Sequence, residues 1–276
     1  MDILTTADEL AQWRRTGQGT VGLVPTMGNL HAGHMALVDT AAARCDRVIV
    51  SVFVNPLQFG PDEDLDSYPR TFDADRDALA NKRVDAIFAP SVEQIYPNGM
   101  THQTTVRVMG VSEILCGSRR PAHFKGVATI VTKLFNLVRP DAAFFGEKDY
   151  QQLMVIRRMV EDLCMGVEIV GVPTVREADG LARSSRNQYL TANERRQAAS
   201  LSAALRDCAE QLAAGHRDFR SLEARGWARL VDAGFDPDYF EIRGADLAPA
   251  EPAMKRFRVL AAAHIGRARL IDNIGV

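Results

Sequence analysis

Two histidines three residues apart, His31 and His34, follow an apolar run and open a segment with helical spacing. At a helix start both side chains project to one side, beside unpaired backbone N–H groups and the positive end of the helix dipole, so they can hold an anion. Gly33 between them removes a side chain, which lets a nucleoside lie against the backbone. The alternative is that His31 caps the helix, His34 packs locally and the glycines only make a turn. The pattern leaves both interpretations open.

Two further polar segments carry phosphate-binding chemistry. In Gly-Glu-Lys-Asp-Tyr-Gln-Gln, residues 146–152, the Lys148 ammonium can neutralise phosphate charge and Asp149 can hold a ribose hydroxyl or a hydrated magnesium ion. Residues 182–187 place two hydroxyls beside the Arg186 guanidinium, whose planar fork fits nonbridging oxygens. Taken alone, each segment is better explained as a surface ion pair or a polar loop. Together with the histidines they favour a polyphosphate ligand.

Neutral amides at Asn55 and Gln58 follow the second apolar run. They suit a small hydroxy acid or amine, because an amide bonds either polarity without imposing a charge. The acidic, turn-rich residues 61–69 come next. A solvated loop is the expectation there ahead of a metal site, and a mobile lid is compatible with the prolines and the length.

The elements that must position these groups alternate between strand and helix. Nearly continuous apolar runs predict strands at residues 20–25, 47–54, 84–89, 141–145 and 167–175. Helical spacing predicts helices at residues 34–45, 72–82, 127–138 and 150–163. This rhythm predicts an α/β fold with a Rossmann-like, doubly wound parallel sheet whose strand ends carry the ligand site.

A change of pattern after Val175 predicts a domain boundary. Residues 1–175 are expected to form the Rossmann-like domain, and residues 176–276 a smaller α+β domain. The second domain is predicted to hold a long helix at 191–214, begun by a capping box, and strands at 239–243, 256–262 and 268–274.

Composition excludes several classes of protein. The 276 residues carry 33 Lys and Arg against 35 Asp and Glu, a net charge of -2, which offers no basic field for nucleic acid. We expect a cytoplasmic protein without a membrane partner, since the sequence shows neither a signal segment nor a long apolar run. The four cysteines are too far apart for a zinc site. The G-x-G-x-x-G spacing at residues 17–22 precedes the first predicted strand instead of following it, so it is not a dinucleotide site.

The combined segments resemble those of the pantothenate synthetase (pantoate–β-alanine ligase) family, within the adenylate-forming H-x-G-H nucleotidylyltransferase superfamily. The resemblance rests on residues 25–34, 53–60, 68–71, 116–117, 120–129, 145–152, 184–187 and 269–273. It implies a ligase of pantothenate (coenzyme A precursor) biosynthesis: pantoate and ATP, with Mg²⁺, form pantoyl adenylate and pyrophosphate, and the amine of β-alanine then displaces AMP. It also implies that residues 1–175 bind nucleotide and pantoate, that residues 176–276 close over the ATP site, and that the protein forms a homodimer through the N-terminal domain.

The resemblance assigns roles to individual residues. The implied catalytic residues are His31, His34 as proton donor, Lys148 on the α-phosphate, and Arg186. The implied nucleotide-binding residues are Met27, Gly28, Asn29, Leu30, His31, Ala32, Gly33, His34, Gly146, Glu147, Lys148, Asp149, Val175, Arg183, Ser184, Ser185 and Arg186. The expected substrate-binding residues are Gln58, Gln152, Asn55 and Tyr68, with Tyr68 on a flexible gate. No metal ligands are assigned.

One position departs from the family: Arg183 stands where Met or Leu is usual. We expect contact with the nucleotide there to run largely through the backbone. Two other functions remain possible from the residues. An H-x-G-H nucleotidylyltransferase would need cationic groups for a phosphorylated acceptor, whereas Asn55, Gln58 and Gln152 offer neutral amides. A non-enzymatic nucleotide-binding module would show no turnover.

Overall fold

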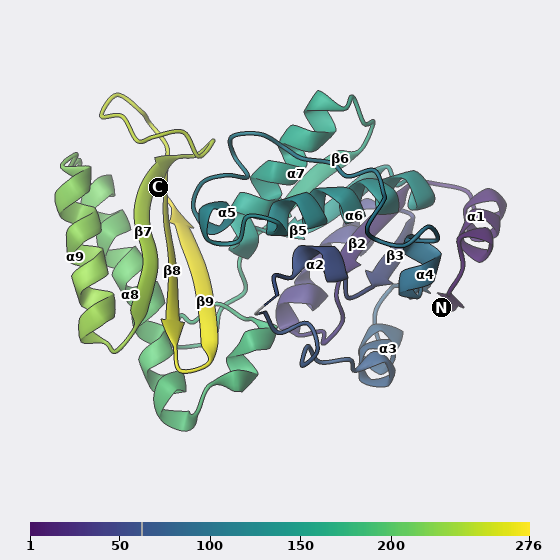
Figure 1. Cartoon of the computed structure of the whole chain (residues 1–276), viewed down its shortest axis with the longest axis horizontal. Coiled ribbons are helices and arrows are strands. Elements are labelled where there is room, and N and C mark those ends of the chain that lie inside the picture. Colours follow the sequence, from purple (N-terminus) through teal and green to yellow (C-terminus); the bar gives the residue numbers. More distant parts are fainter. Residues whose placement is uncertain (62) are drawn as a thin grey trace. The chain divides into compact units, whose positions relative to one another are not determined.

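A computed structural model describes residues 1–61 and 63–276 (Figure 1). Contacts group the chain into two units: Met1–Glu147 with Gln151–Pro173, and Lys148–Tyr150 with Thr174–Val276. The sequence led us to expect a single division at residue 175. The contacts differ from that expectation in grouping the short turn at Lys148–Tyr150 with the C-terminal residues.

The first unit is built on a six-stranded parallel sheet, as the buried apolar runs predicted. Its strands are β1 (Asp2–Leu4), β2 (Val21–Thr26), β3 (Arg47–Val52), β4 (Ala86–Phe88), β5 (Ala142–Gly146) and β6 (Glu168–Val172). Their order is β1-β4-β3-β2-β5-β6. The chain runs outward from β2 through β3 to β4 and later returns to the other side of β2 as β5. The direction of winding therefore reverses between β2 and β5, where parallel α/β sheets bind ligands at the carboxyl ends of their strands.

Helices of the first unit connect these strands. They are α1 (Ala7–Thr16), α2 (Ala32–Arg44), α3 (Phe72–Ala80), α4 (Val92–Ile95), α5 (Cys116–Arg119), α6 (His123–Val138) and α7 (Tyr150–Asp162), with short 3₁₀ turns η1 (Pro56–Gln58) and η2 (Glu147–Asp149). Helix α6 buries most of its residues. The sequence predicted its apolar stripe from residue 127 onward. Among the described residues no helix combines the length and the apolar character needed to cross a bilayer.

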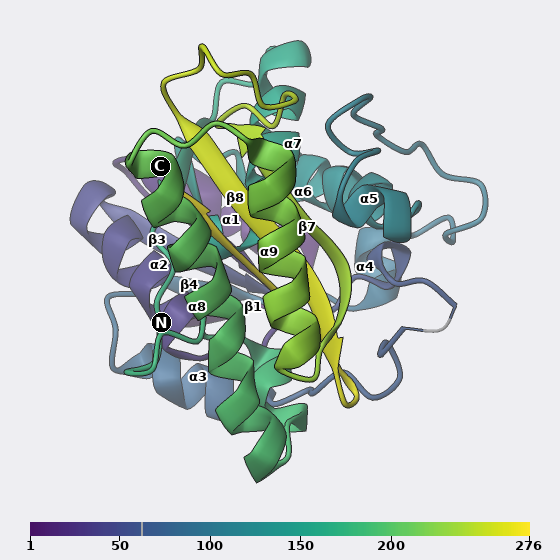
Figure 2. The same ribbon diagram turned by 90° about the vertical axis from the view of Figure 1, so that its left-hand side faces the viewer.

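The second unit pairs two helices with an antiparallel sheet. Strands β7 (Asp236–Gly244), β8 (Phe257–Ile265) and β9 (Ala268–Gly275) lie in the order β7-β8-β9. Helices α8 (Ala192–Ala213) and α9 (Phe219–Asp232) pack side by side on the sheet (Figure 2), and η3 (Ser185–Tyr189) precedes α8. The predicted capping box at Thr191 and Glu194 is present. On α9, a Cβ at Gly226 would lie 2.3 Å from the Phe240 ring, so glycine is needed for the helix to approach the sheet.

The expected α/β class with a parallel sheet and a smaller C-terminal α+β part is confirmed. The 17–22 glycine motif has a packing explanation. Gly22 lies inside β2, where a Cβ would come within 3.0 Å of Cys45 Sγ and 3.1 Å of the Phe144 ring. The sequence analysis did not anticipate β1, α1 or α9.

Candidate active site

The two histidines cap helix α2 reciprocally. His31 is the N-cap, and its Nδ1 accepts from Gly33 N at 3.1 Å, while His34 Nδ1 accepts from His31 N at 3.3 Å. The rings are 4.1 Å apart between centroids. Because both Nδ1 atoms accept, both imidazoles are neutral and carry their proton on Nε2. The helix begins at Ala32, two residues earlier than the predicted start at His34. The sequence left helix capping and anion binding as alternatives. In the structure they are compatible, because the cap occupies Nδ1 and leaves the Nε2–H of each ring as the donor that an anion needs.

The loop before these histidines is held by a buried carboxylate that sequence analysis missed. Asp75, on α3, accepts from Asn29 N at 3.0 Å and Leu30 N at 2.7 Å, and Thr71 Oγ1 donates to it at 3.3 Å. Its exposure is only 3%. Gly28 and Asn29 both have positive φ, 82° and 51°, a conformation that needs support at Asn29. Asp75 thus shapes the loop, although its local sequence is that of an ordinary acidic helix start.

The amides Asn55 and Gln58 form one buried cluster. Asn55 is 1% exposed and its Nδ2 donates to Gln58 Oε1 and to Gly126 O, both at 3.2 Å. The Tyr96 hydroxyl donates to Asn55 Oδ1 at 2.6 Å, and burial raises the pKa of Tyr96, which keeps it a donor. Among the residues that the structure describes, Gln58 Nε2 has one acceptor, Met27 Sδ at 3.0 Å, and a thioether sulfur is a weak one. Asn55 therefore orients Gln58, whose amide N–H is the group poorly satisfied by protein.

The acidic residues 61–69 are partly anchored. Asp62 lies outside the described residues. Burial opposes ionisation of Glu63, but its ion pair with Arg120 outweighs this and holds the pKa of Glu63 below its usual value. Tyr68 is 6% exposed and packs edge-on against the Phe59 ring. The segment is thus less solvated than a simple loop.

Adjacent glutamines at the start of α7 differ in their surroundings. Gln151 is buried and satisfied, with Nε2 donating to Val111 O and Ile114 O and Oε1 accepting from Cys116 N. Gln152 is half-buried, and within the part of the chain that the structure describes nothing bonds to its side chain. The amide of Gln152 can therefore take a hydrogen bond from a ligand, and its assignment to a substrate stays a prediction.

A second group of expected residues gathers within the C-terminal unit. The chain turns back on itself between Val175 and Arg183, and Arg183 N donates to Val175 O at 2.9 Å. Ser184 is the N-cap of η3, and its Oγ accepts from Arg186 N at 3.3 Å. Lys148 and Ser184 line one shallow surface depression together with Asn187 and Asp272.

Lys148 lines this depression, and its side chain is 19% exposed. Its ammonium has one ionic partner, the Asp149 carboxylate at 3.8 Å, which is beyond hydrogen-bond distance. Among residues 1–61 and 63–276 nothing else pairs with it. An ammonium that is largely removed from water and donates no hydrogen bond to any of these residues favours an anionic ligand. No cluster of three metal-ligating side chains occurs within the same ranges.

Each unit therefore assembles part of the expected site. The first brings the loop at residues 27–34 to Gln58 through Met27, and the second brings Lys148, Val175, Arg183 and Ser184 into one neighbourhood. Arg183 itself turns aside, since its Nη2 pairs with Glu177 Oε2 at 2.8 Å. Asp75, Tyr96 and Asn187 are contributors that the sequence analysis did not single out.

Comparison with known proteins gives a consistent result. The chain is 57% identical over 266 residues to pantothenate synthetase of Alkalilimnicola ehrlichii, covering 96% of this chain and 93% of that one. It is 55% identical over 277 residues to pantothenate synthetase of Idiomarina loihiensis, covering 100% and 98%.

Solved structures agree. Pantothenate synthetase from Thermus thermophilus matches with a TM-score of 0.93 at 46% identity over 99% of both chains. Pantoate-β-alanine ligase from Francisella tularensis, complexed with β-γ ATP and β-alanine, matches with a TM-score of 0.83 at 34% identity over 99% of this chain and 97% of that one. The model of the family described as pantoate-β-alanine ligase matches residues 2–275. The chain belongs to the pantoate-β-alanine ligase family.

Proposed function

We propose that this chain performs the family's ligation with the two groups of side chains described above. The enzyme condenses pantoate with β-alanine at the expense of ATP. The pantoate carboxylate attacks the α-phosphorus of ATP and pyrophosphate leaves; the amine of β-alanine then attacks the acyl carbon of pantoyl adenylate, AMP leaves, and the amine loses a proton. Activation is needed because a free carboxylate is a poor electrophile, whereas the mixed anhydride carries a good leaving group.

The observation that carries the proposed site is the reciprocal cap of α2. It fixes His31 and His34 as neutral Nε2–H donors at the N-terminus of α2, the helix that follows the carboxyl end of β2. We assign both as Nε2–H hydrogen-bond donors to ATP phosphate oxygens, and this hydrogen bond from His34 is the form that its implied role as proton donor takes. The backbone of residues 27–30, held by Asp75, forms the rest of this part of the ATP site.

Lys148 is assigned to the charge that grows on the α-phosphate, supported by its largely buried ammonium, whose one ionic partner, Asp149, is too far away for a hydrogen bond. Ser184, Ser185 and Arg186 are assigned to the remaining phosphates, and Gly146, Glu147, Val175 and Arg183 to the nucleotide. ATP would enter with Mg²⁺, which binds mainly phosphate oxygens and water and needs few carboxylates from protein. Asp149, whose side chain is 45% exposed, fits that requirement.

The neutral amides are assigned to the acid and the amine. Gln58 Nε2 would exchange its weak Met27 acceptor for a pantoate or β-alanine oxygen, with Asn55 fixing the amide from behind. Gln152 would hold pantoate through its carboxylate or hydroxyl, and Tyr68 would belong to a gate over these substrates. These amides offer no cation for a phosphorylated acceptor, which argues against transfer of AMP to such an acceptor.

Coupled assays test this function and the site. Pantoate alone should release pyrophosphate from magnesium-ATP, and adding β-alanine should yield AMP and pantothenate. Without any pantoate-dependent pyrophosphate the adenylate route is wrong. A dinucleotide product with a phosphorylated acceptor would indicate a nucleotidylyltransferase, and binding without turnover would indicate a nucleotide-binding module.

We further propose that the enzyme is a cytoplasmic homodimer and that its activity requires Mg²⁺. Light scattering at several protein concentrations tests the dimer, and titration with a chelator followed by Mg²⁺ tests the metal requirement.

A further inference from the structure

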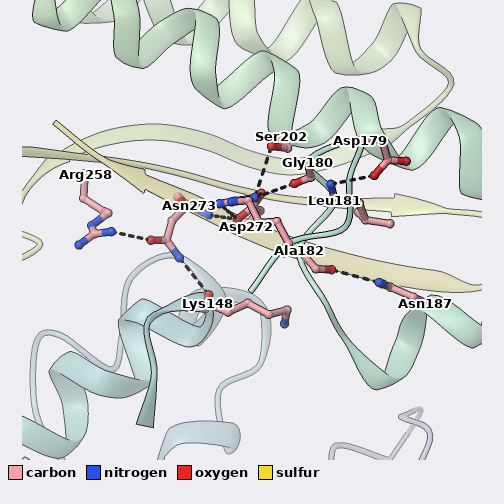
Figure 3. A network of polar contacts seen from close by, with 11 residues as sticks. Lys148, Asp179, Gly180, Leu181, Ala182, Asn187, Ser202, Arg258, Asp272 and Asn273 are labelled. Atoms are coloured by element: carbon pink, nitrogen blue, oxygen red, sulfur yellow. Dashed lines mark hydrogen bonds and ion pairs between the residues drawn. The ribbon is translucent and has the colours of Figure 1, made fainter. Parts of the chain in front are cut away.

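The turn that carries Lys148 is tied to the last strand of the chain. Asn273, on β9, donates from Nδ2 to the backbone carbonyl of Lys148 at 2.9 Å (Figure 3). Its Oδ1 accepts from Arg258 Nη1 at 3.0 Å, so both ends of the amide are used and its orientation is fixed. Asn273 is only 4% exposed. The contact joins residues 125 positions apart, within the C-terminal unit.

A buried ion pair holds Asn273 in turn. Arg176 contacts Asp272 with two hydrogen bonds of 2.6 and 2.9 Å, and the Asp272 side chain is 2% exposed. Asp272 Oδ1 also accepts from Asn273 N at 2.7 Å, and Arg176 Nη2 donates to Asn273 O at 3.2 Å. A bidentate pair of this kind is strong and specific in geometry. The backbone of Asn273 is therefore fixed on both sides.

Tyr150, the residue after Asp149, also contacts the antiparallel sheet and the residue that follows β7. The Arg258 guanidinium lies 3.7 Å over the Tyr150 ring, and the Tyr150 hydroxyl donates to Ala245 O at 2.7 Å. Lys148 and Tyr150 are thus both anchored to the antiparallel sheet. These contacts explain why Lys148–Tyr150 groups with the C-terminal residues although it follows β5 directly.

We propose that Asn273, supported by Arg258 and the Arg176–Asp272 pair, is a positioning residue that sets the place of the Lys148 ammonium in the reaction. A lysine side chain has four flexible methylenes, so the ammonium is well placed only when its backbone is fixed. A misplacement of about 1 Å at a reacting centre can cost on the order of a hundredfold in rate. The inference rests on the proposed role of Lys148.

Asn273→Asp tests it with the smallest change. The carboxylate keeps an acceptor for Arg258 but has no donor for the Lys148 carbonyl. We expect pantoate-dependent pyrophosphate release to slow by about 10- to 100-fold, with little change in the KM for ATP, because placement matters most in the transition state. Asn193→Asp is the matched control: it makes the same change at an exposed position in the first turn of α8, where Nδ2 donates to Gln197 Oε1 and to nothing else among the described residues. It should stay within twofold of the parent.

A double-mutant cycle separates positioning from general damage. In a Lys148→Ala background there is no ammonium to misplace, so Asn273→Asp should slow the reaction by no more than about twofold further. If Asn273→Asp fails to fold, Arg258→Lys is read in the same cycle, because it loosens the support of the Asn273 amide. It should lose roughly threefold to tenfold in rate, again only where Lys148 is present.

Three results would overturn the inference. Asn273→Asp could keep a rate within threefold of the parent while Lys148→Ala loses a hundredfold; the role of Lys148 would then stand and the positioning role would be wrong. The two losses could multiply in full, which would mark ordinary structural damage. Finally, Lys148→Ala could turn over normally, in which case the assignment of Lys148 fails and the inference fails with it.

Discussion

Replacing Asp75 by Asn tests whether the loop before the histidines is held from α3. Asp75 is 3% exposed and accepts two backbone N–H groups, from Asn29 at 3.0 Å and Leu30 at 2.7 Å. Asparagine has the same shape but only one acceptor oxygen, so its NH₂ group must face one of the two donors. One hydrogen bond is weakened and the other is replaced by a donor facing a donor.

The magnitude follows from these two bonds. Hydrogen bonds to charged groups contribute about 1.5–3 kcal/mol each, and an unsatisfied buried donor costs about 1–3 kcal/mol. We therefore expect the free energy of unfolding of the first unit to fall by about 2–4 kcal/mol. Gly28 and Asn29 have positive φ, so without both bonds the loop leaves this conformation and must be re-ordered when ATP binds. Since 1.4 kcal/mol is tenfold, the lower limit corresponds to roughly 30-fold weaker ATP binding.

Urea denaturation and ATP titration of the same preparation measure both effects. Asp73→Asn is the matched control, because Asp73 lies on the same helix with its side chain 85% exposed and pairs only with Arg76. Such an exposed pair contributes up to about 1 kcal/mol, and no change in ATP binding is expected. If Asp75→Asn matches Asp73→Asn in both stability and ATP affinity, Asp75 does not hold the loop.

Four more substitutions have defined outcomes. His34→Ala and Lys148→Ala should each lose at least ~100-fold in pantoate-dependent pyrophosphate release, because each removes preorganised stabilisation of phosphate charge; near-normal turnover in either contradicts the assigned role. Arg183→Met should change ATP affinity, measured by calorimetry, by less than tenfold, because the Arg183 side chain pairs with Glu177 and does not line the depression beside Lys148. A larger loss would show that the guanidinium participates. Burial raises the pKa of Glu223, so the folded state is disfavoured once this group ionises; Glu223→Gln should raise the thermal midpoint at pH 7, and the gain should disappear below about pH 4, where the acid is neutral in both states. A midpoint that is equally raised at both pH values would contradict that origin.

Much of the fold was predictable because burial on both faces of a parallel sheet demands continuous apolar runs. Strands β2, β3 and β5 show such runs and were placed to within a few residues. Strand β1 has only three residues, too few for any period to appear. Helix α1 carries a capping box from Thr6 to Glu9, a local signal that could have revealed it.

The site was predictable only where its chemistry is local. His31 and His34 cap a helix that follows a strand, and strand, turn and cap are all contiguous in the sequence. Asp75 gives no such signal, because an acidic residue near a helix start is normally solvated. Its partners lie 45 and 46 residues earlier in the chain, and only the folded packing of α3 brings them together. Its burial is therefore a tertiary property.

The support of Lys148 is likewise a tertiary property that its local sequence does not reveal, and it concerns a residue with a proposed catalytic role. Its position after β5 assigns it by sequence to the parallel sheet, yet its carbonyl is bonded to Asn273 and its neighbour Tyr150 is bonded to Ala245. The position of the Lys148 side chain depends on its own backbone, and that backbone is hydrogen-bonded to Asn273 of the antiparallel sheet. Substitutions that loosen β8 or β9 should therefore disturb the ammonium before they disturb the histidines. The distance in sequence between a catalytic group and its support is a poor guide to which mutations reach it.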